Sequence, residues 1–578
     1  MIETDVLIVG SGPAGSSAGL MLSTYGIPNL IVTKYGWLAD TPRAHLTNQR
    51  TMEILRDLGI EAEAVAQATP QHLLGHTAFC TSLAGEELGR LQTFGTDPRS
   101  RANHQLASPC STCDLPQNLL EPILLGAAAT RGTKVRFDTE YLSSQQDADG
   151  VTAELRDRVS GQSYRIRAKY LLGADGSRSK VAEDASLPME GKMGVAGSIN
   201  IVFRADLAKY VEYRPSVLYW VLQPGSDIGG VGMGVIRMVR PWHEWLAIWG
   251  YDINAGEPQL DDAAAEGIVR NLIGDPDVPI QIRSTSLWTV NDLYATRYSN
   301  GRVFCMGDAV HRHPPMNGLG SNTSIQDSYN LAWKLALVLK GKASPSLLDT
   351  YNEERAPIGR QIVKRANKSI EETGPIFEAL GLHDTTEAAQ MRRNMEARKA
   401  NTPDAAIQRE KLRKAIAHKC YEFNTHGVEM NQRYCSAAVV PDGTPEPLFD
   451  RDAELHYHPT TWPGARLPHV WLQKNGRPIS TLDVAGKGRF AVLTGIGGEG
   501  WVEAARKVSA TYGVEIAAVV IGPGRDLTDL YGEWANAREI AESGCVLVRP
   551  DAHVGWRAAE CGDEENRLAE AVGRILGR

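Results

Sequence analysis

The sequence predicts an α/β protein in which a Rossmann-type dinucleotide-binding domain carries an inserted antiparallel β-sheet domain and is followed by a small α/β domain. Three observations support this prediction. The apolar strand Val6–Val9 runs directly into the glycine-rich turn G-S-G-P-A-G at 10–15. Residues 195–297 alternate apolar and polar side chains over strand lengths. Beyond a proline-rich stretch, strand and helix patterns alternate again.

The glycine turn predicts a site for a dinucleotide. Gly10 permits the tight turn, Gly12 leaves room for a pyrophosphate against the backbone, and Gly15 lets the following helix pack close to the strand. The helix N-terminus then offers unpaired N–H groups to the phosphates. A second strand is expected over 29–34, and a dinucleotide fold usually ends this strand on an acid that binds ribose. Thr33 and Lys34 stand there instead.

Composition narrows the function classes. The chain of 578 residues is too long for one hydrophobic core and predicts several domains. A formal net charge of -8 argues against nucleic-acid binding, which needs a basic face. No apolar run reaches the length of a membrane span and the chain enters a strand at once, so we expect a cytoplasmic protein without a signal peptide. Cys110 and Cys113 form an isolated C-x-x-C in a polar loop, which does not favour a zinc or redox site.

The segment after the second strand predicts a polar loop that leads into an amphipathic helix within 42–59, with Met52, Leu55 and Leu58 inward. Another helix is expected over 115–131. Residues 134–137 and 151–155 are expected to pair as a hairpin around the turn 147–150. A buried strand then ends in the Asp-Gly turn at Asp175.

Strands are expected over 198–203, 217–222 and 229–238, within the antiparallel sheet. Tyr219 and Trp220 are neighbours on a strand and must point to opposite faces, so both cannot line one pocket. We expect them in the core.

A second strand end that suits a cofactor lies at 302–306. It is followed by Gly307 and Asp308, a glycine-rich loop over 313–323, and a long helix expected over 324–339. The aspartate can bind a ribose or ribityl hydroxyl, and amides after Gly318 can hold polar ring atoms. His311 and His313 lack nearby carboxylate or cysteine partners, which does not favour a metal site.

The last part of the chain begins after a linker rich in proline. Strands are expected over 489–494, 516–521 and 545–550, with a helix over 501–512. The turn G-I-G-G-E-G at 495–500 also matches G-x-G-x-x-G, but the next strand ends in Ile521-Gly522-Pro523 without a ribose acid. We therefore interpret this second turn as a flexible turn and not as an NAD(P) site.

The three motifs at 10–15, 173–179 and 307–308, with the loop after them, together resemble the FAD-dependent aromatic hydroxylases, the class A flavin monooxygenases of the p-hydroxybenzoate hydroxylase and phenol hydroxylase type. The similarity covers essentially the whole chain. It is strongest to the chlorophenol-hydroxylating branch, on the segments 42–53, 215–230, 307–323 and 426–434. The resemblance implies a thioredoxin-like C-terminal domain whose redox cysteines are absent, with the turn 495–500 in their place.

The resulting domain prediction has five parts. It gives an FAD-binding domain over 1–180, with some strands of the sheet domain near 70–105, and a substrate-binding β-sheet domain over 181–297. The FAD-binding domain returns with a helical region over 298–440. A linker over 441–465 then leads to the thioredoxin-like domain at 466–578.

The resemblance also implies the residues that contact the cofactor. They are Gly10, Gly12, Pro13, Ala14, Gly15, Thr33, Lys34, Arg43, Gln117, Asp175, Gly307, Asp308, Gly318, Leu319, Gly320 and Asn322. Asp175 is expected between the FAD site and the approach of NADPH. The arginine that the family places shortly after Ser179 is replaced here by Val181-Ala182-Glu183.

The chemistry that the resemblance implies is attack of a flavin C4a-hydroperoxide on an aromatic ring, after NADPH has reduced the FAD. A phenol has a pKa near ~10, like tyrosine, so a base that removes its proton makes the ring more nucleophilic. His45 is the candidate base, because it stands where phenol hydroxylases place an acidic one. Asn291 and Tyr294 are candidates to bind the substrate oxygen, and Pro315 is the candidate from the flavin loop.

The sequence therefore predicts an NADPH- and O2-dependent hydroxylation of a phenol, for example a chlorinated phenol such as 2,4-dichlorophenol, ortho to its hydroxyl group to give a catechol. A homodimer or homotetramer is expected. Two alternatives remain open at this point. One is a flavin halogenase or a non-oxygenating FAD-dependent reductase, although the halogenase motif G-W-x-W-x-I-P is absent. The other is an FAD-containing binding protein whose C-terminal domain recruits a partner.

Overall fold

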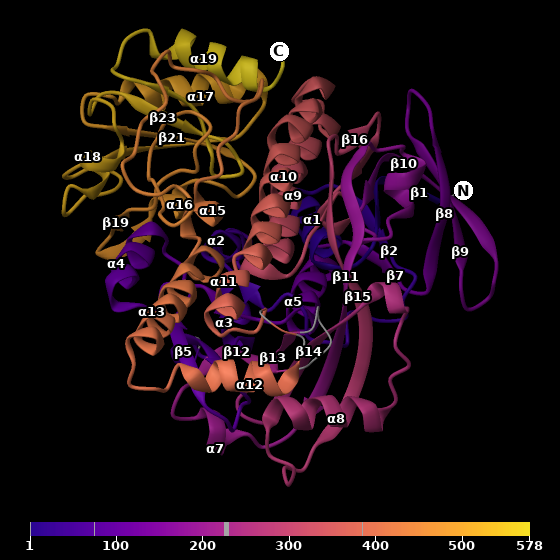
Figure 1. Ribbon diagram of the computed structural model, residues 1–578. Coiled ribbons are helices and arrows are strands. Elements are labelled where there is room, and N and C mark those ends of the chain that lie inside the picture. The colour runs from indigo at the N-terminus through magenta and orange to yellow at the C-terminus, as the bar shows by residue number, and fades with distance from the viewer. Residues whose placement is uncertain (1, 74, 225–230, 384, 386) are drawn as a thin grey trace.

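The structure is a computed structural model that describes residues 2–73, 75–224, 231–383, 385 and 387–578. Its ribbon shows a nucleotide-fold sheet near the N-terminus, a second large sheet with α8 (Asp262–Ile273) across it, and the C-terminal elements at the other side of the long helices α9 and α10 (Figure 1). Among the described helices, none is both long and apolar enough to cross a lipid bilayer.

The nucleotide-fold sheet has its parallel core in the order β17-β10-β1-β2-β7, with the glycine turn following β1 at its centre. Buried apolar strands of this kind need helices on both faces, and α1 packs against both α5 and α9. The strands are β1 (Ile2–Val9), β2 (Asn29–Val32), β7 (Lys134–Arg136), β8 (Thr139–Gln146), β9 (Val151–Asp157), β10 (Ser163–Gly173), β16 (Ser299–Asn300) and β17 (Val303–Cys305).

The helices around this sheet are α1 (Pro13–Thr24), α2 (Gln49–Asp57), α3 (Glu61–Gln67), α5 (Gln117–Thr130), α6 (Lys180–Asp184), α9 (Gly320–Leu339) and α10 (Asp349–Glu371). The predicted amphipathic helix is confirmed as α2, with Met52, Leu55 and Leu58 buried.

Two predictions are wrong in detail. The hairpin around 147–150 forms between 151–155 and β8, whereas 134–136 form the parallel strand β7 instead of its first arm. The long helix begins at Gly320 and not at 324, so Asn322 lies in its first turn.

The second large sheet has the order β18-β15-β11-β14-β13-β12-β4-β5. It is antiparallel except where β12 and β4 run parallel, a pairing that brings in a strand from much earlier in the chain. Its strands are β4 (His76–Cys80), β5 (Glu87–Gln92), β11 (Met189–Arg204), β12 (Ser216–Pro224), β13 (Val231–Arg240), β14 (Glu244–Tyr251), β15 (Gln281–Ala295) and β18 (His311–Arg312). The start of the strand expected over 229–238 lies outside the described residues.

The two faces of this sheet have different coverings. One face packs on α8, and Tyr219 belongs to that core. Trp220 belongs to the core on the opposite face, which is covered by α11 to α13, so the prediction of opposite faces and core positions is confirmed. The helices beside this sheet are α4 (Pro98–Ala107), α7 (Ala208–Val211), α11 (Gly374–Ala379), α12 (Ala388–Ala397), α13 (Pro403–His418), α14 (Cys420–Phe423) and α15 (His426–Met430).

The C-terminal part has the strand order β22-β21-β23-β24, with β21 and β22 parallel and the other pairs antiparallel. With α17 between β21 and β22 and α19 after β24, this is the thioredoxin-like arrangement that we expected. The elements are β19 (Trp471–Lys474), β20 (Arg477–Ser480), β21 (Phe490–Gly495), β22 (Ile516–Ile521), β23 (Cys545–Val548), β24 (Val554–Ala558), α16 (Thr481–Val484), α17 (Gly500–Tyr512), α18 (Glu533–Ala537) and α19 (Glu564–Ile575).

Candidate active site

The first glycine turn has the geometry of a phosphate site. Gly10 has a φ of +107°, and a Cβ there would lie 2.1 Å from the carbonyl oxygen of Ala174. A Cβ at Gly15 would lie 1.9 Å from the carbonyl oxygen of Gly10. At Gly12 the nearest atom to such a Cβ is Glu121 Oε1, at an ordinary contact distance of 3.8 Å, so Gly12 is the least crowded of the three glycines. The helix that follows, with Pro13 and Ala14 in its first turn, has no side-chain cap and no acid there. Its N–H groups are thus available to an anion.

Thr33 and Lys34, two predicted cofactor-binding residues, follow the end of β2, and neither has a carboxylate. The backbone of Thr33 is held by Arg136 and Thr139, with its N–H donating at 3.0 Å and its carbonyl accepting at 2.8 Å. Lys34 is exposed, and its Nζ lies 5.4 Å from the centre of the Tyr35 ring.

A buried carboxylate that the sequence did not single out lies beside Gly12. Glu121 accepts a hydrogen bond from Gln117 Nε2 at 2.5 Å and from the Ala39 N–H at 2.7 Å. Burial raises the pKa of its carboxyl group. The carbonyl of Arg43 accepts from the Gln117 N–H at 2.8 Å, while the Arg43 side chain is exposed. The structure therefore places Gln117 next to Arg43, and Glu121 holds the Gln117 side chain through a hydrogen bond.

Asp175 caps the turn after β10. Its carboxylate accepts from Ser179 Oγ at 2.5 Å and from the Lys180 N–H at 2.8 Å. Burial raises the pKa of Asp175. The carboxylate thus holds the chain at the start of α6 and closes the same edge of the sheet as Gly10.

The loop 307–320 passes from the nucleotide-fold sheet to α9. Gly307, Asn317 and Gly318 have positive φ values of 62°, 63° and 64°. Asp308 is exposed at the start of the loop, and Leu319 is buried at its end, just before Gly320 opens α9. The side chain of Asn322 is fully used by the backbone: it accepts from the Asn48 N–H and donates to the carbonyls of Leu46 and Gly318. Its amide therefore fixes the loop.

His311 and His313 have protein partners. His311 Nε2 lies 3.0 Å from Asp327 Oδ2, and His313 Nδ1 lies 2.6 Å from the carbonyl oxygen of Pro314. Burial, followed by the charge of His311, lowers the pKa of His313 to about 4. No group of three or more His, Cys, Asp or Glu side chains in the described part of the chain is arranged to hold a metal ion.

His45 lies in a buried polar group that we call the His45 cluster: His45, Asp114 and Arg237. His45 Nδ1 is 3.6 Å from Asp114 Oδ1, which accepts a hydrogen bond from Arg237 Nη2 at 2.8 Å. The three side chains come from the loop before β3 (Leu46–Thr47), from β6 (Cys113–Asp114) and from β13. The strands β3 and β6 pair with each other, so the cluster forms where the nucleotide fold meets the second sheet.

The His45 cluster is incompletely paired. Both ring nitrogens of His45, Asp114 Oδ2 and Arg237 Nε are buried and have no hydrogen-bond partner among the described residues. Burial, followed by the charge of Arg237, holds the pKa of His45 well below its usual value. Burial raises the pKa of Asp114, and Arg237 opposes this rise. Buried polar groups in folded proteins are normally paired, so these four atoms indicate a place for a polar ligand.

The other predicted catalytic residues do not join this cluster. Asn291 Oδ1 accepts from the Gly194 N–H at 2.9 Å, and the Tyr294 hydroxyl donates to Glu190 at 2.9 Å. Both are on β15, three strands away from β13 in the sheet order, which is roughly 14 Å. Pro315 is exposed in the loop 307–320. Asp114 and Arg237 were not among the predicted site residues. The one sequence signal for them was Arg237 between the apolar residues Ile236 and Met238 of a strand.

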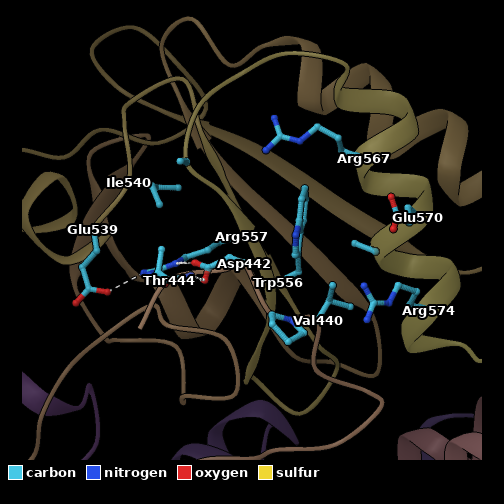
Figure 2. A pocket seen from close by; sticks show the side chains of 13 residues that line it. Val440, Asp442, Thr444, Glu539, Ile540, Trp556, Arg557, Arg567, Glu570 and Arg574 are labelled. Carbon is cyan, nitrogen blue, oxygen red and sulfur yellow. Dashed lines mark hydrogen bonds and ion pairs between the residues drawn. The ribbon is translucent and has the colours of Figure 1, made fainter. Parts of the chain in front are cut away.

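A cavity of about 370 Å³ lies elsewhere, between β24, α19 and the segment 440–444 (Figure 2). Its Arg557 is already paired, with Nε donating to Asp442 at 2.5 Å and Nη1 to Glu539 at 2.9 Å. The cavity belongs to the C-terminal part of the chain and does not include the glycine turn, so we assign it no part in the reaction.

Comparison with known proteins agrees with this geometry. Residues 3–366 match the family model described as an FAD binding domain, and residues 460–578 match that of the aromatic-ring hydroxylase C-terminal domain. The chain is 59% identical to 2,4-dichlorophenol 6-monooxygenase of Delftia acidovorans, over 100% of this chain and 98% of that protein. It is 53% identical to phenol 2-monooxygenase of a Pseudomonas species, over 99% and 93%.

A solved structure shows the same fold. The flavin-dependent monooxygenase PieE, in complex with FAD and substrate, superimposes with a TM-score of 0.96 at 46% identity, over 100% of this chain and 99% of that one.

Proposed function

The chain belongs to the family of FAD-binding aromatic-ring hydroxylases, and on that premise we propose that it hydroxylates a phenol ortho to its hydroxyl group to give a catechol, with NADPH and O2 as co-substrates. The relatives named for 2,4-dichlorophenol and for phenol favour a phenol of that size, and the higher identity favours a chlorinated one.

The residues of the first glycine turn fit FAD. The absence of a side chain at Gly12 and the uncapped N-terminus of α1 suit its pyrophosphate, and the exposed Asp308 suits a hydroxyl of its ribityl chain. Bound FAD supplies the transfer of electrons from NADPH and the activation of O2. The protein itself must bind the phenol, orient its ring and hold its proton.

The observation that carries the proposal is the incomplete pairing of the His45 cluster. A phenol hydroxyl is both a donor and an acceptor, and it can pair with His45 and with the free Arg237 Nε. A buried site with unpaired donors and acceptors favours a ligand that completes them, because leaving such groups unpaired costs about 1–3 kcal/mol each.

Each member of the cluster has a role in this proposal. The lowered pKa of His45 keeps its ring neutral, so that it can accept the proton of the phenol. Asp114 Oδ1 lies 3.6 Å from Nδ1, which is too long for a hydrogen bond, so both ring nitrogens stay available to the substrate. Arg237 places positive charge beside the phenolate oxygen. Removing the proton raises the electron density of the ortho carbon, which is the atom to be oxidised.

The experiment that tests the proposal measures NADPH consumption, O2 uptake and product with the purified holoenzyme. We expect a panel of phenols, with 2,4-dichlorophenol included, to stimulate both rates and to give one catechol per NADPH. A reductase would consume NADPH without this stimulation. A binding protein would hold FAD without any turnover. Either result would overturn the proposal.

Three further expectations belong to the same proposal. We propose that the protein is cytoplasmic and forms a homodimer or homotetramer, which light scattering of the purified protein tests. The division at 180, 297, 440 and 465 is proposed as the domain organisation. Limited proteolysis tests this division. We expect the first cleavage to occur within 441–465, earlier in the digestion than cleavage at any other linker.

A further inference from the structure

The loop 307–320 connects three parts of the molecule and needs a fixed shape. It starts where β17 ends, contributes β18 to the edge of the second sheet by pairing with β15, and ends at α9. A Cβ at Gly307 would lie 2.8 Å from Ser324 Oγ and 3.3 Å from the Ala14 Cβ, so the start of the loop is wedged between α9 and α1. The same two helices are tied by the Ser328 hydroxyl, which donates to the Ala14 carbonyl at 2.8 Å.

One buried carboxylate on α9 holds this loop at two places. Asp327 Oδ2 accepts from the Gly307 N–H at 3.1 Å and lies 3.0 Å from His311 Nε2. Its other oxygen accepts from Arg355 Nε at 2.7 Å. The side chains of Asp327, His311 and Arg355 are all 0% exposed. Asp327 therefore fixes both the first residue of the loop and the strand that joins it to the second sheet.

Arg355 extends the same contact to the end of the loop. Its Nη2 lies 3.4 Å from the carbonyl oxygen of Thr323, in the first turn of α9, and its Nη1 donates to Gln432 and to the Tyr434 hydroxyl. Burial alone would raise the pKa of Asp327, but Arg355 and His311 hold it below its usual value. The carboxylate thus stays charged while it is out of contact with water.

We propose that Asp327 and Arg355 are positioning residues for the flavin: they clamp the two ends of the loop 307–320 so that its backbone keeps the arrangement that FAD binding and coupled hydroxylation require. They touch neither the glycine turn nor the His45 cluster and act through Gly307, His311 and Thr323. The effect on FAD binding rests on the family, whereas the effect on coupling rests also on the proposed function.

The test uses D327N and H311L, with D551N as a matched control. Asp551 is an equally buried carboxylate flanked by an arginine and a histidine, Arg549 and His553, but it lies in the C-terminal part. D327N leaves the buried charge of Arg355 without its carboxylate partner and can cost folding. H311L removes the loop contact without leaving a buried charge, so it decides the question if D327N does not fold. Folding is checked by circular dichroism.

The first readout is the Kd of the apoprotein for FAD, from flavin fluorescence, and the second is the share of NADPH that ends as hydrogen peroxide instead of catechol. We expect D327N to raise the Kd at least tenfold and H311L at least threefold, each with a shifted flavin absorbance spectrum and more peroxide. D551N should lower stability and leave both readouts within twofold of wild type. Folded D327N and H311L with wild-type Kd, spectrum and peroxide share would overturn the clamp. Absence of catechol from the wild-type enzyme would overturn only the proposed function, because the FAD titration does not depend on it.

Discussion

Two buried groups of charged side chains in this molecule have opposite states of pairing. The first is the His45 cluster. The second, which we call the joining cluster, consists of Lys334, Glu354, Arg549 and Asp551 and connects α9 and α10 to the C-terminal part. Glu354 accepts from Lys334 at 2.7 Å and from both Arg549 Nη atoms, at 2.6 and 2.9 Å.

The joining cluster has no unpaired polar atom within the described residues, whereas the His45 cluster has four. The joining cluster is fully buried, and in the His45 cluster His45 and Asp114 are buried while the Arg237 side chain is 12% exposed. The difference indicates that burial of charge alone does not mark a reaction site. A cluster whose polar atoms are all hydrogen-bonded within the protein stabilises the fold. A cluster that leaves buried donors and acceptors unpaired indicates a ligand-binding site.

The largest expected effect comes from the His45 cluster. H45Q removes the proton acceptor but keeps a polar side chain, so we expect kcat with phenol to fall by about 10²–10⁴-fold. The melting temperature should change little, because the ring nitrogens of His45 have no hydrogen-bond partner among the described residues. The control is H104Q, a half-buried histidine on α4, which should retain the wild-type kcat. A wild-type kcat in H45Q would show that the cluster is not the site of proton transfer.

In the joining cluster we expect a substitution to lower stability and to leave kcat unchanged. E354Q leaves the charges of Arg549 and Lys334 buried without their carboxylate, and breaking such a pair costs about 3–5 kcal/mol of unfolding free energy. Denaturation in urea measures this loss, and the folded fraction should keep the wild-type kcat. The exposed Glu410, paired with Arg413, provides the control: E410Q should leave the free energy of unfolding almost unchanged, because solvent screens an exposed ion pair. A catalytic defect in folded E354Q without loss of stability would contradict the distinction between the clusters.

Glu429 offers a third case, a buried carboxyl group without a cation partner. Burial raises its pKa to about 8. Because the folded pKa lies above the unfolded one, the folded state binds the proton more tightly, and stability present below about pH 4.5 is lost as the pH rises toward 8. We expect a loss on the order of 4 kcal/mol across this window, because each pKa unit corresponds to about 1.4 kcal/mol, and a flatter profile in E429Q. Urea denaturation at several pH values checks this. Parallel profiles in the two proteins would show that Glu429 is not the group responsible.

The acidity of the substrate should modulate the role of His45. Chlorine substituents lower the pKa of a phenol, so a more acidic phenol depends less on a base. We therefore expect the loss of kcat in H45Q to be about tenfold smaller with 2,4-dichlorophenol than with phenol, which is about 1.4 kcal/mol of activation free energy. Equal losses with the two substrates would mean that His45 binds the hydroxyl without removing its proton.

The sequence predicted the parts of the fold that depend on local patterns. The strand before Gly10, the amphipathic helix with Met52 and the opposite faces of Tyr219 and Trp220 all follow from periodicity and turn chemistry. It failed where distant segments pair. Residues 134–136 join β2 as a parallel strand and not a hairpin, because long-range pairing leaves no periodic trace in the strand itself. The strands of the second sheet near 70–105, which are β4 and β5, were expected only from the family resemblance.

Prediction of the candidate active site was also limited to residues that a local motif marks. His45 was found from its position after a family motif, but its partners Asp114 and Arg237 come from two other segments and become neighbours only in the folded chain. The second glycine turn also shows how context decides. Its Gly497 N–H is taken by the carboxylate of Glu499 at 2.9 Å, so an internal acid occupies the position that an anion would need.

The most direct test of the central claim compares the affinity of the oxidised holoenzyme for 2,4-dichlorophenol and for 1,3-dichlorobenzene, the same ring without the hydroxyl group. Titration of the flavin absorbance gives both Kd values. Because the unpaired atoms of His45 and Arg237 need a hydroxyl, we expect the phenol to bind at least about 100-fold more tightly, and H45Q to narrow this ratio. Equal affinities for the two compounds would contradict the assignment of the His45 cluster as the phenol site.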